Sequence, residues 1–189
     1  MAAPRLLFNE KNFRRYCRLL AGRDTDLAAI IEQYGYPPMW VRPPRFQTLV
    51  LTILEQQVSL ASAYAAFRKL REKIGYVTPE KILKLTDEEM RACYFTRQKM
   101  GYARELARAI QTKRLRLKTL HTMEDEEVRA VMIQLKGIGN WTIDVYLMHA
   151  LRRTDLFPLG DIALVNSMKE IKGLPKETPG ARLLQLAEA

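Results

Sequence analysis

The sequence contains few of the residues that bind transition metals. Among its 189 residues are two cysteines, Cys17 and Cys93, and two histidines, His121 and His149. The cysteines form no Cys-x-x-Cys pair, and four scattered ligands do not match the spacing of a zinc or iron–sulfur site. We therefore expect no cysteine-based zinc site or iron–sulfur cluster, and we expect both thiols to be reduced in an intracellular protein.

Long apolar runs and strand patterns are also missing. No apolar segment reaches the roughly 20 residues that a membrane-spanning helix needs, and the N-terminus has no signal-peptide pattern. No stretch gives a clear strand signal. No repeat of fixed period and no low-complexity segment stands out. The sequence thus predicts no membrane partner and a cytoplasmic location, or a nuclear one in a eukaryote.

Positive charge, in contrast, is abundant. The chain has 31 Lys and Arg residues against 21 Asp and Glu residues, which gives a formal net charge of +10. A surplus of this size favours a polyanionic partner, although a basic protein without such a partner has the same composition. Hydrophobic residues make up 48% of the chain, enough for one compact domain or two small lobes that share a cleft.

Apolar residues recur at helical spacing along nearly the whole chain. This pattern predicts an all-α fold of about nine or ten short helices. Trp40 lies in a loop with four prolines, at 37–44, and we expect it to plug the core rather than to contact a ligand. Capping residues predict helix starts at Asn9, Ser59, Thr78, Thr86 and Thr122.

The most informative stretch runs from Leu135 to Asp161 and contains a hairpin with Gly137 and Gly139. Glycines at this spacing let the backbone turn sharply and approach another group closely. The next helix is predicted to start at about Trp141, so that its N–H groups form an anion site that suits a phosphate. Asp161 follows a Pro/Gly turn and opens a predicted helix, 161–171. Its carboxylate is either an N-cap alone or an N-cap that also aims a reactive group.

This pattern resembles the helix-hairpin-helix (HhH-GPD) DNA glycosylase superfamily. Its members carry a hairpin of the form hydrophobic-x-Gly-hydrophobic-Gly, then a Gly/Pro-rich loop and a catalytic Asp. The resemblance covers most of the chain and implies that fold, with two helical lobes around a cleft. It also implies that Asp161 drives base excision from duplex DNA with a damaged base. We predict a single monomeric domain, 1–189, with about 46–136 in one lobe and 1–45 with 137–189 in the other.

The resemblance also implies a set of DNA-binding residues. Gln57 would enter the duplex where the damaged nucleotide has left, with Gln56 and Ser59 beside it, which offsets part of the cost of unstacking. The alternative for Gln56 and Gln57 is a polar surface turn. Arg97 and Lys99 are either phosphate contacts or part of a solvated helix face. The hairpin set expected at a phosphate comprises Lys136, Gly137, Ile138, Gly139, Asn140 and Thr142.

Trp141 distinguishes between branches of the superfamily. Relatives that also cut the DNA strand carry a lysine at this position, which forms a Schiff base with the sugar. With tryptophan the chain resembles the monofunctional 3-methyladenine branch, and an indole face attracts a cationic base by on the order of 1–2 kcal/mol. Core packing is the alternative for Trp141. Tyr146 is a second base-pocket residue, although that branch has its aromatic one position earlier, at Val145. Asp144 is given a structural or surface role.

The sequence therefore predicts a DNA glycosylase for alkylated purines of the 3-methyladenine type, acting by base flipping and hydrolysis in base excision repair, without AP-lyase activity. No organic or redox cofactor is implied. The resemblance implies only a monovalent cation, Na⁺ or K⁺, at the backbone carbonyls of Leu135 and Ile138. The alternatives are a catalytically inactive helix-hairpin-helix DNA-binding protein and a glycosylase for mismatched or oxidised bases.

Two departures from the family pattern concern the ends of the chain. Larger members of the branch have an additional N-terminal domain, for which this chain has no room. Members also continue past a segment containing Trp, Pro and Arg into a closing helix, whereas this chain stops at Ala189. We therefore expect the closing helix to be missing and 178–189 to be a helix cut short.

Overall fold

The computed structural model describes residues 7–188, and this part of the chain is helical. Within it, the only β-type pairing is an isolated bridge between Leu7 and Arg153, so the predicted all-α fold is confirmed. Residues 1–6 and 189 of the predicted domain lie outside the described residues. The elements are α1 (Phe13–Arg23), α2 (Thr25–Tyr34), α3 (Phe46–Glu55), α4 (Leu60–Ile74), α5 (Pro79–Lys84), α6 (Asp87–Ala92), α7 (Arg97–Gln111), the 3₁₀ helix η1 (Leu120–Thr122), α8 (Asp125–Met132), α9 (Asn140–His149), α10 (Ile162–Ile171) and α11 (Gly180–Glu188).

The described chain forms two compact units. Unit 1 comprises residues 7–41 and 152–188, and unit 2 comprises residues 42–151. The sequence predicts 137–151 in the other lobe. In the structure this segment belongs to unit 2, because α9 packs against α3 and α8. No helix of residues 7–188 is long and apolar enough to cross a membrane.

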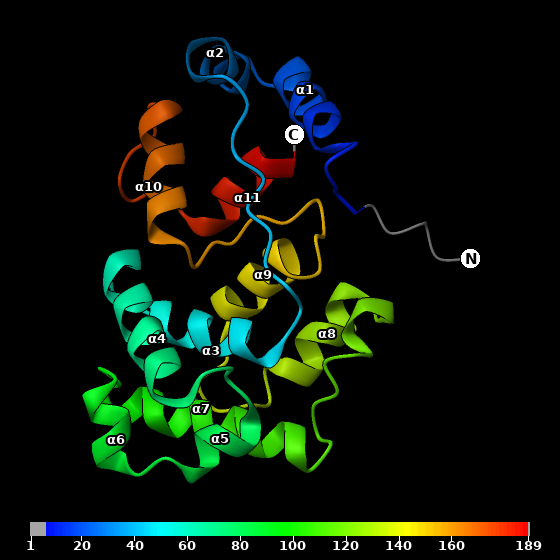
Figure 1. Ribbon diagram of the computed structural model, residues 1–189. Coiled ribbons are helices and arrows are strands. Elements are labelled where there is room, and N and C mark those ends of the chain that lie inside the picture. Colours follow the sequence, from blue (N-terminus) through cyan, green and yellow to red (C-terminus); the bar gives the residue numbers. More distant parts are fainter. Residues whose placement is uncertain (1–6, 189) are drawn as a thin grey trace. The chain divides into compact units, whose positions relative to one another are not determined.

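Unit 2 is built around α3, which Figure 1 shows in cyan among α4, α7 and α9. All residues of α3 except Gln47 are buried, so this helix has no solvated face. The consecutive residues Thr142 to Leu147 of α9 are buried as well. A helix that is buried on every side belongs to the centre of a core. Each buried leucine or isoleucine contributes about 1.5–3 kcal/mol relative to an exposed one, so unit 2 has a firm apolar centre.

Three predicted helix starts in unit 2 are confirmed. The hydroxyl groups of Ser59, Thr78 and Thr86 each accept a backbone N–H three residues further on, at the starts of α4, α5 and α6. Thr86 also takes part in a complete capping box with Glu89. Each such cap stabilises its helix by about 1 kcal/mol, which suits short helices whose first turns are exposed.

Three other local predictions are wrong. The Asn9 side chain accepts the N–H of Asn12 at 3.2 Å and closes a turn, so that α1 begins one turn later. Thr122 lies in η1, and the N-cap of α8 is Glu124, which forms a capping box of its own. Trp40 is 66% exposed and does not plug the core. Its loop is too rich in proline for helical packing.

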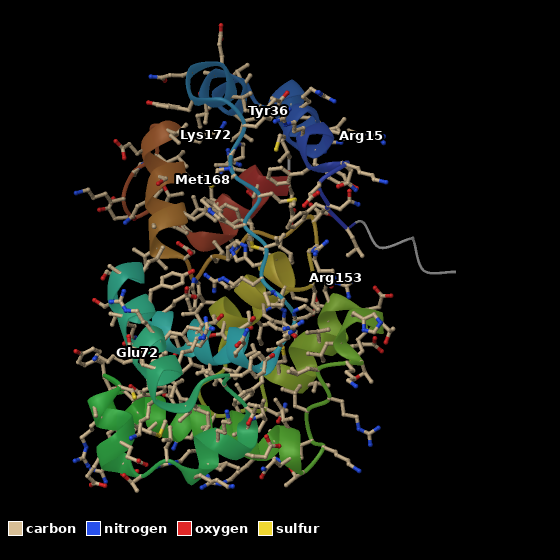
Figure 2. All side chains as sticks on the ribbon, viewed as in Figure 1. Arg15, Tyr36, Glu72, Arg153, Met168 and Lys172 are labelled. Atoms are coloured by element: carbon tan, nitrogen blue, oxygen red, sulfur yellow. The ribbon has the colours of Figure 1, made fainter. Side chains whose placement is uncertain are left out.

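Unit 1 is thinly packed and relies on polar contacts. Helices α1 and α2 pack against each other, yet no residue of α2 or α10 is buried. The end of α10 is tied to the start of α2 by the Lys172 ammonium, labelled in Figure 2. Its Nζ lies 2.7 Å from Oδ2 of Asp24 and 2.7 Å from Oδ2 of Asp26. Asp24 is at the same time the N-cap of α2.

The stability of unit 1 should therefore depend on pH through Asp24. The hydrogen bond from Lys172 holds the pKa of the Asp24 carboxyl below its ordinary value. A lowered folded-state pKa contributes stability above the unfolded value of about 3.9, and this contribution is lost as the pH falls through the folded value. We expect Asp24→Asn, which keeps the cap oxygen, to lower Tm at pH 6, and we expect the difference from the parent protein to shrink below about pH 4. Thermal melts at pH 3 to 7 measure this. A difference independent of pH would contradict the ion-pair explanation.

Candidate DNA-binding and catalytic residues

The hairpin between α8 and α9 packs closely against Tyr102 of α7. Gly137 has φ +90°, and a Cβ built on it would lie 2.0 Å from Cγ of Tyr102. The tyrosine ring thus occupies the space where any other residue would place its side chain. The N–H of Ile138 donates to the carbonyl of Leu135 at 3.0 Å, and both side chains are buried. Gly137 is therefore required by the fold itself.

Gly139 has a different environment. Its φ is −102°, and within the described chain no heavy atom outside its immediate neighbours lies within 4 Å of the place that a Cβ would take. It is the N-cap of α9, which begins at Asn140, one residue earlier than predicted. Since glycine has no side-chain acceptor, the first N–H groups of α9 lack the cap that Ser59 and Asp161 give to α4 and α10. Such donors form an anion site.

The hairpin side chains divide into exposed and buried ones. Lys136 and Asn140 are exposed, whereas Ile138 and Thr142 are 3% and 1% exposed. Ile138 and Thr142 could therefore contact a phosphate only through backbone atoms, and their place in the hairpin set stays a prediction. The hairpin would then bind a phosphate chiefly through main-chain N–H groups, supported by one exposed ammonium.

Asp144 has a structural role, as predicted. Its Oδ1 lies 2.7 Å from Nη2 of Arg129, and its side chain is largely buried. The same guanidinium donates from Nη1 to Oδ1 of Asn140 at 3.2 Å. Arg129 thus connects α8 to the first turn and to the second turn of α9. The sequence does not reveal this role of Arg129, because an arginine on a predicted surface helix gives no local sign of a partner 15 residues away.

The turn between α3 and α4 presents Gln57 to solvent. Gln57 is exposed and has φ +57°, a left-handed conformation that costs a non-glycine residue about 1 kcal/mol. Its neighbour Gln56 points inward, and its Nε2 donates to the carbonyl of Gly137 at 2.8 Å and to Oγ1 of Thr142 at 3.0 Å. The Ser59 hydroxyl caps α4. Of the three residues predicted here, Gln57 has the exposed amide that insertion into the duplex, the predicted wedge role, requires.

Arg97 and Lys99, predicted either as phosphate contacts or as part of a solvated helix face, differ in the structure. Arg97 is exposed on the first turn of α7. Lys99 is 9% exposed, and its Nζ donates to the carbonyl of Leu54 at 2.7 Å. Burial lowers the pKa of this ammonium. The prediction for Lys99 is therefore wrong, because its ammonium is directed to the end of α3 rather than to the surface.

The two predicted base-pocket residues lie on α9. Trp141, in its first turn, is half-buried. Tyr146 is 1% exposed, and in the described part of the chain its hydroxyl has no hydrogen-bond partner. Burial raises the pKa of this hydroxyl. The structure thus places Tyr146 in the core of unit 2 and corrects its prediction as part of an accessible pocket.

Asp161 is the N-cap of α10, as predicted. Its Oδ1 accepts the N–H of Leu164 at 3.1 Å, and its own N–H donates to the carbonyl of Pro158 at 2.8 Å. These two bonds hold the residue at both its side chain and its main chain. The carboxylate is half-buried. An N-cap that is fixed in this way gives a carboxylate a defined direction, which is what a reactive group needs.

One buried ion pair was not predicted. Glu55, the last residue of α3, is 6% exposed, and its two oxygens each lie 2.7 Å from a nitrogen of Arg42. A lone carboxylate at the end of a mostly apolar helix was the signal available in the sequence, because a buried charge needs a partner. Among the described residues, no three His, Cys, Asp or Glu side chains come together as a metal site.

A sequence profile described as HhH-GPD superfamily base excision DNA repair protein matches residues 50–188. This segment includes the hairpin, Gln57 and Asp161, and it is well over half of the chain. The chain belongs to the HhH-GPD superfamily.

Curated relatives agree with this assignment. The Bacillus subtilis protein YfjP is 32% identical over 153 residues, which are 77% of this chain and 53% of that protein. DNA-3-methyladenine glycosylase 1 of Schizosaccharomyces pombe is 28% identical over 165 residues, which are 83% of this chain and 72% of the relative. The chain thus spans about half to three quarters of the length of these relatives.

Solved structures share the fold. The 3-methyladenine DNA glycosylase Mag1 of Schizosaccharomyces pombe, in complex with abasic DNA, has a TM-score of 0.84 and 25% identity, covering 92% of this chain and 88% of that one. A DNA-3-methyladenine glycosidase from Bacillus halodurans has a TM-score of 0.73 and 30% identity, covering 89% and 78%. The predicted helix-hairpin-helix glycosylase fold is confirmed.

The contact between Gly137 and Tyr102 makes a prediction about stability. Alanine at position 137 has to adopt φ +90° and to displace an aromatic ring, so we expect Gly137→Ala to lower the free energy of unfolding by at least about 1–2 kcal/mol. Gly101→Ala in α7, where the described chain leaves open space around the site, is the matched control and should be neutral or stabilising. Urea unfolding of both variants measures this. Equal stability of the Gly137 variant and the parent protein would show that the ring moves away freely.

Proposed function

We propose that this protein is a monofunctional DNA glycosylase that removes alkylated purines of the 3-methyladenine type from duplex DNA. The observation that carries the proposal is the capped carboxylate of Asp161 in an HhH-GPD chain that has Trp141 where strand-cutting relatives have lysine. The names of the relatives support it, since the Schizosaccharomyces pombe relative and a second Bacillus subtilis relative, 27% identical over 189 residues, are named DNA-3-methyladenine glycosylases.

The chemistry assigned to Asp161 follows from the charge that develops on the sugar. Breaking the N-glycosidic bond gives the deoxyribose oxocarbenium character, and a fixed carboxylate stabilises that charge or takes a proton from the attacking water. An alkylated purine already carries a positive charge and leaves without prior protonation. A single carboxylate therefore suffices, and no second acid is needed for the leaving group.

Trp141 supplies recognition rather than covalent chemistry. An indole cannot form a Schiff base, so the route by which an amine attacks the sugar and cuts the strand is absent at this position. An electron-rich ring instead attracts a cationic base through stacking and cation–π attraction. Under this proposal, Trp141 accounts both for a preference for cationic purines and for a lack of AP-lyase activity.

DNA binding is assigned to the hairpin and the Gln57 turn of unit 2. The uncapped N–H groups at the start of α9 suit a phosphate oxygen, and the open surroundings of Gly139 allow it to come close. Gln57 is the exposed side chain that fills the stack when the damaged nucleotide has left. The net charge of +10 supports a polyanionic partner. The monomeric state and the cytoplasmic or nuclear location stay predictions.

A monovalent cation would be held at the hairpin by backbone carbonyls, and its positive charge would favour a phosphate there. Carbonyl oxygens are suitable ligands for Na⁺ or K⁺, and the predicted ligands are those of Leu135 and Ile138. The Leu135 carbonyl already accepts the N–H of Ile138, but a carbonyl oxygen has a second lone pair. The residues therefore fit such an ion, and no step of the reaction depends on it.

Asp161→Asn is the decisive test of the proposed reaction. Asparagine is an equally good N-cap, so the variant should fold and bind DNA while losing the negative charge. We expect release of free base from methylated duplex DNA to fall by about 10²–10⁴-fold, measured by chromatography of the released purines. Asp155→Asn, at an exposed aspartate of the same unit, is the matched control and should keep the parent rate.

Two outcomes would contradict the proposed reaction. Undiminished release by Asp161→Asn would remove Asp161 from catalysis. No release by the parent protein, with salt-dependent DNA binding intact, would favour the inactive DNA-binding protein.

A separate prediction concerns the phosphate site at Gly139. The methyl group in Gly139→Ala meets only open space within the described chain, so we expect a folded variant whose Tm falls only by the small loss of stability that alanine causes at an N-cap, about 1 kcal/mol or less. The same methyl group would stand where a phosphate has to approach, and we expect affinity for duplex DNA to fall about tenfold, which is about 1.4 kcal/mol. Fluorescence anisotropy at two salt concentrations measures this. Full affinity in a folded variant would place the phosphate elsewhere.

A glycosylase for oxidised or mismatched bases is the second candidate. Endonuclease III of Sulfolobus acidocaldarius is 29% identical over 118 residues, which are 60% of this chain and 51% of that protein. Tryptophan at position 141 speaks against a lyase. A panel of duplexes with one lesion each distinguishes the candidates: release of 8-oxoguanine or of mismatched thymine, but not of methylated purines, would favour the second.

A further inference from the structure

We infer that Gln56 is a positioning residue that fixes the Gln57 turn relative to the phosphate-binding hairpin. Insertion of Gln57 into the duplex and binding of the duplex backbone by the hairpin are thereby coupled. The inference rests on the proposed function, because it assigns DNA-related roles to the two segments that Gln56 joins. It concerns unit 2 alone.

Gln56 makes the direct connection with both hydrogens of its amide. Nε2 donates to the carbonyl of Gly137 at 2.8 Å and to Oγ1 of Thr142 at 3.0 Å. A primary amide nitrogen has two hydrogens, so one side chain serves both partners. These partners are 81 and 86 residues away in the sequence, one in the hairpin and one in the first turn of α9.

Both backbone segments that Gln56 joins have unusual conformations. Gln57, directly after it, has φ +57°, and its bonding partner Gly137 has φ +90°. A left-handed non-glycine residue such as Gln57 persists only where the surrounding contacts determine it, whereas glycine adopts a positive φ readily. The hydrogen bond from Gln56 to Gly137 therefore connects a strained turn to the hairpin and sets their distance from one another.

Helix α7 contacts both segments, the end of α3 before the Gln57 turn and the hairpin. The Lys99 ammonium donates to the Leu54 carbonyl at the end of α3, where the negative end of the helix dipole favours a cation. The Tyr102 ring packs under Gly137. Residues three apart lie on the same face of a helix, so one face of α7 carries both segments. This platform holds the two segments separately, and Gln56 is the side chain that links them directly.

The arrangement separates positioning from folding. The α3 helix keeps its apolar core and its Lys99 contact without Gln56, and the hairpin keeps Tyr102. Replacing the amide by an apolar side chain of similar length should therefore leave both segments folded. The two segments would no longer be held at a fixed position relative to one another. Gln56→Met does this without a change of charge. Gln134→Met, at an exposed glutamine just before the hairpin, is the matched control.

The test is a double-variant cycle with Gln56→Met and Gln57→Ala. Base release is measured under single-turnover conditions from methylated duplex DNA. If the wedge works only when Gln56 positions it, each single variant should slow release about tenfold and the double variant should be no slower than either, a strongly non-additive result. On methylated single-stranded DNA, which needs no wedge, Gln56→Met should keep the parent rate. Gln134→Met should match the parent on both substrates.

Three results would overturn the inference. They are losses that multiply in the double variant, an equal loss on single-stranded DNA, and a full parent rate for Gln56→Met on duplex DNA. If Gln56→Met melts far below the parent protein, Gln56→Asn, which keeps the amide but is one methylene too short, is used in the same cycle with the same criteria.

Failure of the proposed function gives a different signal. If the parent protein releases no base, the cycle is repeated on affinity for duplex DNA with a stable abasic-site analogue. In that assay non-additive losses support the coupling, and multiplying losses overturn it.

Discussion

The contact between the Gly137 backbone and the Tyr102 ring is the constraint on which the hairpin depends. Because the ring occupies the place of a Cβ, only glycine allows α7 and the hairpin to approach this closely. The close approach buries Ile138 and sets the point at which α9 begins. The position of the first turn of α9 therefore depends on a packing contact with α7, not on the loop sequence alone.

The two hairpin glycines serve different purposes, and the structure separates them. Gly137 is needed by its positive φ and by the ring beneath it, whereas Gly139 has an ordinary φ and, within the described chain, open surroundings. No packing in residues 7–188 explains a missing side chain at position 139. A glycine that the fold does not require indicates close approach by a group from outside the protein. The N–H groups beside it favour a group with negative charge.

The sequence predicted those features whose partners lie within one helical turn. The Ser59 and Thr86 caps and the Asp161 cap each bond to a residue three positions away, so that short-range patterns contain all the necessary information. The contacts of Lys99 and Gln56 reach 45 and 81 residues along the chain, and no local pattern marks them. The local pattern therefore predicts a surface cation at Lys99 and a neighbour of Gln57 on the same exposed turn at Gln56. In the structure both side chains point inward.

The two units hold their functional groups by different physical means. In unit 2 the Gln57 turn and the hairpin rest on α3, which is buried almost throughout, so their geometry is supported by apolar packing. Asp161 is the N-cap of α10, which buries none of its residues. The cap on Leu164 and the bond to Pro158 contribute to the direction of the carboxylate, and Lys172 ties the far end of the helix to α2. Salt weakens exposed ion pairs and hardly affects apolar packing. High ionic strength should therefore loosen α10, which carries the carboxylate, while α3 and the hairpin keep their geometry.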